Sequence, residues 1–251
     1  MAYHFGKFAW FEHVSQDTAK ARQFYEQLFG WKVKSFAPGG YEVIHNGQDF
    51  IGGIVPADAG DPPHWRSWLS VPDVDDRYAA ALAAGAQAVM PPRDYPGIGR
   101  GATVLDPTGA RVSIWKGATG DRDDEATVKN GDFDWNELAT PDPAKALAFY
   151  EPLFGFTHVD WAMGDMGMYH VINDATGRSR GGIMKAPHEG MPAMWTPYVK
   201  VERCDEIAAR VGPLGGDLVV KPMDVAEVGR IAMLSDPFGA PLGIIQPVVK
   251  A

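Results

Sequence analysis

The chain contains two copies of one sequence module, and this repeat constrains the fold more than any other feature. Residues 8–31 align without a gap onto residues 133–156 at an offset of 125, with 13 identities among 24 aligned positions. Later matches follow at an offset of about 130, including an Asp-Pro-x-Gly-Ala sequence that begins at Asp106 and again at Asp236. A repeat of this length indicates two similar structural units.

We therefore expect a first module over residues 1–120, a linker over residues 121–131 and a second module over residues 132–251. The linker begins with the charged run Asp121–Glu125, which holds no apolar side chain. A segment of this composition is typical of a solvated connection between domains.

Within each module the hydrophobic pattern predicts βαβββ followed by βαβββ. Residues 8–14 alternate as a strand does, and Asp17 then caps a helix that ends at Gly30. In the second copy Asp142 takes the place of the cap, with Pro143 at the first helical position. Further strands are expected at residues 41–46, 50–55, 66–71, 87–90, 102–105 and 111–116, with a second helix between Asp73 and Gly85.

Composition excludes several classes of function. A chain of 251 residues with 45% hydrophobic residues can bury two cores, and a net charge of −9 argues against binding to nucleic acids or anionic membranes. No stretch has 18 uninterrupted apolar residues, and the first residues lack the pattern of a signal peptide, so we expect a soluble, cytoplasmic protein. The single cysteine, Cys204, excludes an internal disulfide and is expected to be a buried core thiol.

The helix from Asp17, with its Phe-Tyr-x-x-Leu-Phe-Gly ending at Gly30, and the Asp106-Pro-x-Gly turn occur in both modules. With these motifs the chain resembles the vicinal oxygen chelate superfamily, which includes glyoxalase I, bleomycin-resistance proteins and extradiol dioxygenases. The resemblance implies an α+β fold of two tandem modules, each a pair of βαβββ units that form a curved sheet cup. It does not imply one reaction, because this fold hosts metal-dependent isomerases and dioxygenases as well as metal-free drug-binding proteins.

The resemblance also places three assignable metal-ligand positions in each module. They are occupied by Trp10, Arg66 and Ser113 in the first module and by Trp135, Thr196 and Gly243 in the second. The remaining ligand would lie within residues 50–55 or 178–184, which hold no His, Asp or Glu. Since none of these side chains suits a divalent ion, we expect no metal cofactor at the family positions. A divalent metal held by relocated ligands stays as a minor alternative.

The same positions identify the inner face of each sheet, which we expect to be an aromatic cup for a planar or apolar small molecule. The expected ligand-binding residues are Trp10, Arg66, Trp68, Ser113, Trp115, Trp135, His170, Thr196 and Tyr198. His170 is included as a cavity candidate because it follows Tyr169 on an expected strand.

A glutamate stands two residues after the first tryptophan of each module, at Glu12 and Glu137. A carboxylate beside tryptophan on an inward face would be desolvated and could act as a general acid or base, so both are candidate catalytic residues. The alternative is structural: each glutamate bonds backbone groups or an arginine, with Arg66 and Arg100 as available partners.

Two further motifs have structural interpretations. Arg100 and Arg230 each follow a glycine, and we expect them to form Asp–Arg clamps with Asp94 and Asp224 rather than to read an anion. The glycine pairs at residues 52–53 and 181–182 lack the pattern of a phosphate loop and are expected to allow a close approach between strands.

Together these features predict a metal-independent, glyoxalase-like protein that binds a small oxygenated or aromatic metabolite. Glutamate-based lyase, isomerase or oxygenase-like chemistry is one alternative, and a non-catalytic protein that sequesters a drug or metabolite is the other. The modules would pair within a monomer or across a homodimer.

Overall fold

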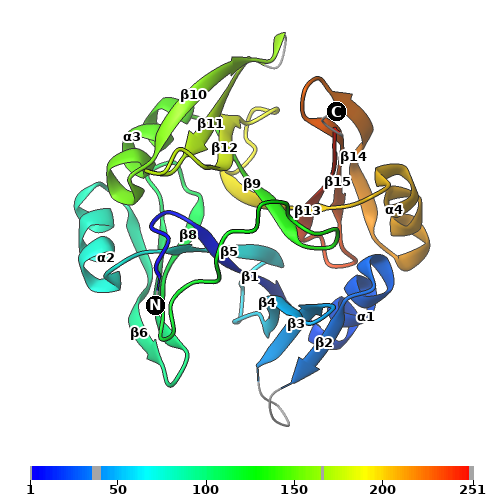
Figure 1. Cartoon of the computed structure of the whole chain (residues 1–251), viewed down its shortest axis with the longest axis horizontal. Helices are drawn as coiled ribbons and strands as arrows, with labels where there is room; N and C mark the ends of the chain where they lie inside the picture. The colour runs from blue at the N-terminus through cyan, green and yellow to red at the C-terminus, as the bar shows by residue number, and fades with distance from the viewer. Residues whose placement is uncertain (1, 36–40, 165–166, 249–251) are drawn as a thin grey trace. The chain divides into compact units, whose positions relative to one another are not determined.

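The structure is a computed structural model that describes residues 2–35, 41–164 and 167–248 (Figure 1). The first half of the chain contains β1 (Phe8–Ser15), α1 (Thr18–Phe29), β2 (Lys32–Ser35), β3 (Glu42–Asn46), β4 (Asp49–Pro56), β5 (His64–Ser70), α2 (Val74–Ala83), β6 (Gln87–Tyr95), β7 (Gly99–Leu105) and β8 (Arg111–Gly117). The second half contains β9 (Phe133–Thr140), α3 (Pro143–Phe154), β10 (Thr157–Ala162), β11 (Met168–Asn173), β12 (Ser179–Lys185), β13 (Met194–Lys200), α4 (Cys204–Val211), a short 3-10 turn η2 (Gly212–Leu214), β14 (Asp217–Val225), β15 (Gly229–Ser235) and β16 (Pro241–Pro247).

The βαβββ order therefore occurs four times, as the sequence predicts. The largest differences from the expected ranges are at β2, which was not expected, and at β6, which extends to Tyr95 where the pattern predicted an end at Met90. Other strand ends differ by up to three residues, as at β7, which begins at Gly99. β2 and β6 are edge strands with mostly exposed side chains, so the burial pattern that marks a strand in the sequence is weak there.

The strands form two eight-stranded mixed sheets, one from each module. Their orders are β2-β3-β4-β1-β5-β8-β7-β6 and β10-β11-β12-β9-β13-β16-β15-β14. In both sheets the first strand of each βαβββ unit pairs in parallel with the last, and the remaining registered pairs are antiparallel. The α+β architecture of two sheet modules is thus confirmed.

α1 and α3 begin and end where the sequence places their caps. The side chain of Asp17 accepts a hydrogen bond from the backbone N–H of Lys20 (3.1 Å), and Gly30 ends α1 in the left-handed conformation (φ 76°). Asp142 caps α3 in the same way, by accepting from Lys145 N–H at 3.0 Å. None of the described helices is long and apolar enough to cross a membrane.

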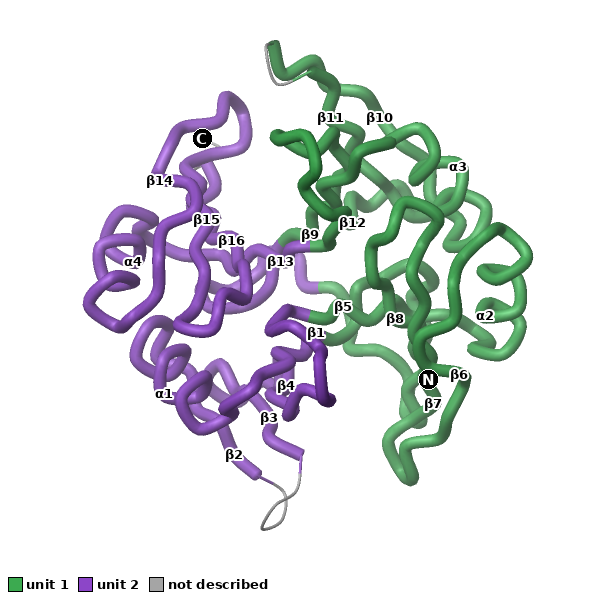
Figure 2. Tube along the Cα trace, turned by 180° about the vertical axis from the view of Figure 1, so that it is seen from behind, with its two compact units in different colours: residues 1–10, 66–124, 135–195 green, residues 11–65, 125–134, 196–251 purple. Residues whose placement is uncertain are grey.

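Two compact units divide the chain differently from the sheets (Figure 2). Unit 1 comprises residues 1–10, 66–124 and 135–195, and unit 2 comprises residues 11–65, 125–134 and 196–251. Unit 1 holds α2 and α3, which contact each other, and unit 2 holds α1 and α4, which do the same. Each core therefore combines a βαβββ unit from one module with a βαβββ unit from the other.

In unit 2 the core is organised around the buried carboxylate of Asp236, the first residue of the second Asp-Pro-x-Gly turn. Its Oδ1 accepts backbone hydrogen bonds within the turn, and its Oδ2 lies 2.7 Å from Nε2 of His13 and accepts from the hydroxyl of Tyr25 at 3.4 Å. The indole N–H of Trp65 donates to the same hydroxyl at 3.0 Å. His13 is fully buried against the rings of Tyr25 and Trp65, on the side of the sheet that α1 covers.

Unit 1 contains the matching arrangement with the modules exchanged. The hydroxyl of Tyr150 donates to Asp106 Oδ2 at 2.9 Å and accepts from the indole of Trp195 at 2.8 Å. The position equivalent to His13 is Leu138, so no imidazole stands there. Burial, reinforced by the nearby aspartate charge, holds the pKa of both tyrosines well above the usual value, and both therefore act as neutral hydrogen-bond donors.

The charged run that begins the expected linker is less solvated than its composition predicts. Asp121 accepts hydrogen bonds from the Ser70 hydroxyl and from the backbone N–H of His4, both at 2.6 Å. Asp124 forms ion pairs with Lys7 (3.0 Å) and Arg180 (2.7 Å). Burial acts to raise the pKa of Asp124, but these two cations outweigh it and hold the pKa far below its ordinary value. The segment is anchored to unit 1 by its carboxylates, which a search for apolar anchors cannot detect.

The glycine pairs permit close approaches, as predicted. A Cβ at Gly52 would lie 2.4 Å from the carbonyl oxygen of Phe11, and a Cβ at Gly181 would lie 2.3 Å from that of Asn136. The second glycine of each pair leaves room for a tyrosine: a Cβ at Gly182 would lie 2.2 Å from the ring and hydroxyl of Tyr169.

We expect the pair formed by Asp236 and His13 to stabilise the chain only above acidic pH. Burial acts to raise the pKa of Asp236, but the contact with His13 and the backbone hydrogen bonds of the turn together lower it more, so the folded-state pKa lies below the ordinary value. The contribution is present above about pH 4 and is lost as the pH falls through the folded-state pKa. Asp236→Asn should therefore lose less free energy of unfolding than the unchanged chain between pH 5 and pH 3, measured by urea denaturation. Asp106→Asn, without an imidazole partner, is the matched control. An acid dependence of Asp236→Asn equal to that of the unchanged chain would contradict the expectation.

Gly182→Ala should destabilise the chain by about 1–3 kcal/mol, because the added methyl group overlaps the Tyr169 ring and forces it to move. Gly212→Ala is the control, since Gly212 has helical dihedral angles and an added Cβ there would meet no atom within 4 Å, and it should change stability by less than about 1 kcal/mol. Thermal unfolding followed by circular dichroism measures both. Equal midpoints for the two variants would show that Tyr169 does not need the space.

Candidate functional site

The inner face of the second module carries a hydrogen-bonded row of three side chains within unit 1. The indole N–H of Trp135 on β9 donates to the hydroxyl of Tyr169 on β11 at 2.8 Å. That hydroxyl donates in turn to Oε2 of Glu137 at 3.0 Å. Trp135 and Glu137 are two residues apart on one strand and so point to the same side of the sheet. The two residues predicted from the sequence are thus brought together, and Tyr169 joins them.

Burial, followed by the charge of Glu137, raises the pKa of Tyr169 well above its usual value. Tyr169 therefore keeps its proton and holds one oxygen of Glu137 in a fixed position. Trp135 and Glu137 are both half-buried, so this row combines an apolar ring surface with a positioned carboxylate.

Unit 2 contains the corresponding pair from the first module. The hydroxyl of Tyr41 donates to Oε1 of Glu12 at 2.6 Å, and Gly53 provides the space for the Tyr41 ring. Glu12 is buried. A carboxylate held by a tyrosine is therefore a repeated feature of both modules.

Four predicted residues of the first module, Arg66, Trp68, Ser113 and Trp115, lie together in unit 1. Trp68 on β5 is registered with Ser113 on β8, and its ring meets the ring of Trp115 edge-on, with centroids 5.5 Å apart. The guanidinium of Arg66 lies 5.7 Å from the centroid of the Trp68 ring. The side-chain hydroxyls of Ser113 and Thr103 are hydrogen-bonded at 2.8 Å.

This aromatic group is more closed than the sequence predicts. Tyr95, from the part of β6 that was not expected, contacts both tryptophan rings edge-on at 6.2 Å and 5.5 Å. Trp68 is only 2% exposed, whereas Trp115 stays half-buried. Trp115 is therefore the tryptophan of this group that offers surface to a ligand without repacking.

The remaining predicted positions are placed as follows. Trp10 is half-buried on β1. Thr196 and Tyr198, on β13 in unit 2, are both buried. Tyr198 is registered with Gly243 on β16, and a Cβ there would lie 2.3 Å from the Tyr198 ring. The tyrosine ring thus fills the space above a position where the resemblance implies a metal ligand.

His170 does not belong to the row formed by Trp135, Tyr169 and Glu137. It follows Tyr169 directly on β11, so the two side chains point to opposite faces of the sheet. Its Nδ1 lies 2.6 Å from Oδ1 of Asp160, its register partner on β10. The prediction that His170 lines the cup was wrong, because it relied on proximity in sequence rather than on strand alternation.

The two arginine motifs form clamps, as predicted. Arg100 pairs with Asp75 (2.7 Å) and Asp94 (2.8 Å), so it is not the partner of a catalytic glutamate. Arg230 binds Asp205 and Asp224 in the same way.

Cys204 is buried at the start of α4, as expected. Burial raises the pKa of its thiol to about 11, which leaves it protonated and unreactive at neutral pH.

Tyr41, Tyr95 and Tyr169 contact the predicted residues and were not themselves predicted from the sequence. A signal for two of them was available: a glycine pair follows Tyr41 and Tyr169 after 11 or 12 residues in both modules. A side chain that overlies a glycine on the neighbouring strand explains why a glycine is needed there.

Comparison with known proteins agrees with this architecture. The model of the Glyoxalase/Bleomycin resistance protein/Dioxygenase superfamily matches residues 7–114. A Mycobacterium tuberculosis protein named "Putative glyoxylase CFP32" is 36% identical over 248 residues, which cover 95% of this chain and 94% of the relative. The anthracycline biosynthesis protein DauV of Streptomyces sp. is 28% identical, with 95% of this chain and 92% of DauV covered.

Two solved structures share the fold. The Mn(II)-bound glyoxalase from Novosphingobium aromaticivorans superimposes with a TM-score of 0.67 at 17% identity, and covers 96% of this chain and 82% of its own. A variant of homoprotocatechuate 2,3-dioxygenase from B. fuscum gives a TM-score of 0.68 at 18% identity, with 98% and 73% covered. The repeated βαβββ units, the full-length relatives and these folds agree, and the chain belongs to the glyoxalase/bleomycin resistance protein/dioxygenase superfamily.

Proposed function

We propose that the chain binds a small oxygenated or aromatic metabolite on the face that carries Trp135, and that Glu137 acts there as a general acid or base. The observation that carries the proposal is the hydrogen-bonded row from Trp135 through Tyr169 to Glu137. It places a carboxylate in a defined orientation beside the half-buried face of an indole, which is suited to stacking against a planar molecule.

The chemistry that this row supports is proton transfer next to a carbonyl group. Glu137 would take a proton from a carbon or hydroxyl beside the ligand carbonyl and return it to a neighbouring atom, which isomerises the ligand without a change of oxidation state. Tyr169 fixes the carboxylate before the ligand arrives, so its orientation costs little during the reaction. The names of the relatives, a glyoxylase and an anthracycline biosynthesis protein, support an oxygenated and partly aromatic ligand class.

The family's metal-ligand positions support a reaction that does not depend on a metal there. Arg66, Trp135 and Thr196 provide no imidazole or carboxylate. The hydroxyl of Ser113 is bonded to Thr103, and the Tyr198 ring covers Gly243. These residues do not fit a divalent ion at those positions, and no step of the proposed chemistry passes through one.

Binding without turnover is the second candidate function. The Glu–Tyr pair recurs in the first module, where Glu12 is buried, and a pair present in both copies suits a structural role as well. The chain would then sequester its ligand as bleomycin-resistance proteins do.

The variant Glu137→Gln distinguishes catalysis from binding without turnover. With 2-hydroxyacetophenone as an aromatic, oxygenated probe, the unchanged chain should catalyse exchange of the ligand's methylene protons with deuterated solvent, followed by NMR. Gln keeps a hydrogen-bond acceptor for Tyr169 but cannot take up a proton, so the variant should lose about 100-fold in exchange rate. Its affinity, measured by quenching of tryptophan fluorescence, should change by less than about threefold because the Trp135 surface is kept.

Glu12→Gln is the matched control and should keep the exchange rate. Full exchange by Glu137→Gln would refute the role of Glu137. Tight binding by the unchanged chain with no exchange above the rate in buffer would favour sequestration.

A further inference from the structure

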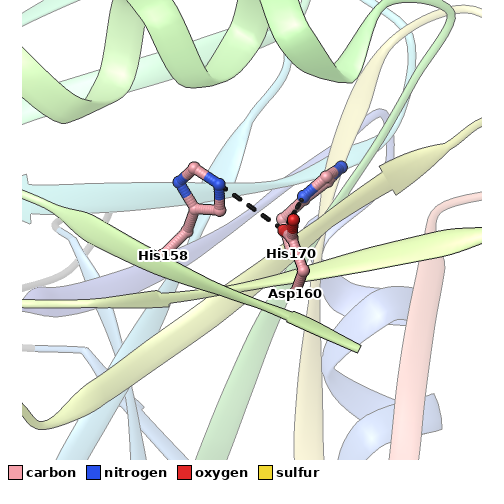
Figure 3. A group of neighbouring side chains, drawn as sticks. All are labelled: His158, Asp160 and His170. Atoms are coloured by element: carbon pink, nitrogen blue, oxygen red, sulfur yellow. Dashed lines mark hydrogen bonds and ion pairs between the residues drawn. The ribbon is translucent and has the colours of Figure 1, made fainter. Parts of the chain in front are cut away.

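Three side chains of the types that bind metals lie close together on the hairpin of β10 and β11, on the face opposite Glu137. They are His158 and Asp160 on β10 and His170 on β11 (Figure 3). His158 and Asp160 are two residues apart and share a face, and Asp160 is the register partner of His170. The hairpin itself therefore brings the three together.

The distances are close to those of a metal site. Nδ1 of His170 lies 2.6 Å and Nε2 of His158 lies 3.5 Å from Oδ1 of Asp160, and one ligand atom from each residue lies within 4.8 Å of the others. Metal–ligand bonds of about 2.0–2.1 Å in a tetrahedral site separate the ligand atoms by about 3.3 Å. Small rotations of the side chains would thus close the group around one ion.

Glu151 on α3 orients one of the imidazoles. Its carboxylate contacts Nδ1 of His158. Because a carboxylate accepts hydrogen bonds, Nδ1 of His158 donates to Glu151, which leaves Nε2, the ring nitrogen that faces Asp160, as the atom that would bind an ion. A carboxylate behind a histidine in this way is the usual second layer of a metal site, where it fixes the tautomer and ring orientation.

The corresponding positions of β2 and β3 in the first module, which are among the described residues, do not carry this group. The register of β2 and β3 places Ser35 opposite Glu42, and the position of His158 is taken by Val33. Glu26, the counterpart of Glu151, accepts a hydrogen bond from the backbone N–H of Val33 instead. The shared fold therefore forms without these three side chains, and their presence in the second module is not explained by the fold.

We propose that His158, Asp160 and His170 bind one divalent transition-metal ion of the Zn²⁺ class. Two imidazoles and one carboxylate suit Zn²⁺ or Co²⁺ better than the oxygen-preferring Mg²⁺ and Ca²⁺, and three protein ligands leave a position for water. The ion would join the edge strand β10 to β11 and, through Glu151, to α3. This site is independent of the proposed chemistry at Glu137, which lies on the other face of the sheet.

The test is a titration of the full chain, stripped with a chelator and dialysed, with Zn²⁺ by calorimetry and with Co²⁺ by visible absorption. We expect one ion per chain. The visible spectrum of bound Co²⁺ should be that of an ion with a low coordination number. His158→Ala, Asp160→Ala and His170→Ala should each weaken binding by at least about 10-fold, and Glu151→Gln by about 10-fold. Zn²⁺ should also raise the thermal midpoint of the unchanged chain, because the ion binds the folded state.

His188→Ala is the matched control, since this exposed histidine lies on a loop after β12 and should leave the affinity unchanged. Circular dichroism of the metal-free variants confirms that each is folded before titration. The proposal is overturned if the unchanged chain binds no ion, or if His158→Ala and His170→Ala bind Zn²⁺ as the unchanged chain does, which would mean that the ion binds elsewhere.

Discussion

A buried aspartate that accepts a hydrogen bond from a buried tyrosine of the other module is the contact on which both compact units depend. Tyr25 of the first module bonds Asp236 of the second, and Tyr150 of the second bonds Asp106 of the first. A phenol in a core must find an acceptor, and a buried carboxylate must find donors, so each group satisfies a requirement that neither module meets alone. The Asp-Pro-x-Gly turn adds backbone donors to the same carboxylate. These bonds link the two modules within each compact unit, and one of them joins residues 211 positions apart in the chain.

On the other face of each sheet, the candidate site also pairs a tyrosine hydroxyl with a carboxylate. Tyrosine rings cover glycines on the neighbouring strand, and their hydroxyls meet the glutamates: Tyr41 over Gly53 reaches Glu12, and Tyr169 over Gly182 reaches Glu137. Arg66, Trp135 and Thr196 stand at positions where the resemblance implies metal ligands, and the Tyr198 ring covers Gly243 at another of them. In the second module the indole of Trp135 extends the row, which gives this copy an apolar surface next to an oriented carboxylate.

Most of the element order could be predicted from the sequence because capping and the repeat are visible there, and the family resemblance supplied the α+β architecture. Asp17 and Gly30 mark the ends of α1 by capping chemistry, and the repeat extends that assignment to the second half of the chain. The contacts that complete the site are not local. Tyr95 reaches Trp68 only because β6 continues past Met90, and the anchoring of Asp124 by Lys7 and Arg180 needs cations that are distant in sequence. His170 shows the limit most clearly, since one position along a strand moves a side chain to the other face.

Differences between the copies indicate which side chains the shared fold does not require. Leu138 shows that the core position of His13 is compatible with an apolar side chain, and Val33 shows the same for the hairpin position of His158. A polar residue that its own duplicate replaces with an apolar one is not required by the shared architecture. At residue 13 the imidazole is fully buried and contacts the carboxylate of Asp236, so its role is structural. At residue 158 the imidazole is partly exposed and lies near Asp160 and His170, the other two residues of the proposed metal site, so the comparison of the copies separates a structural histidine from one that the proposal assigns to an ion.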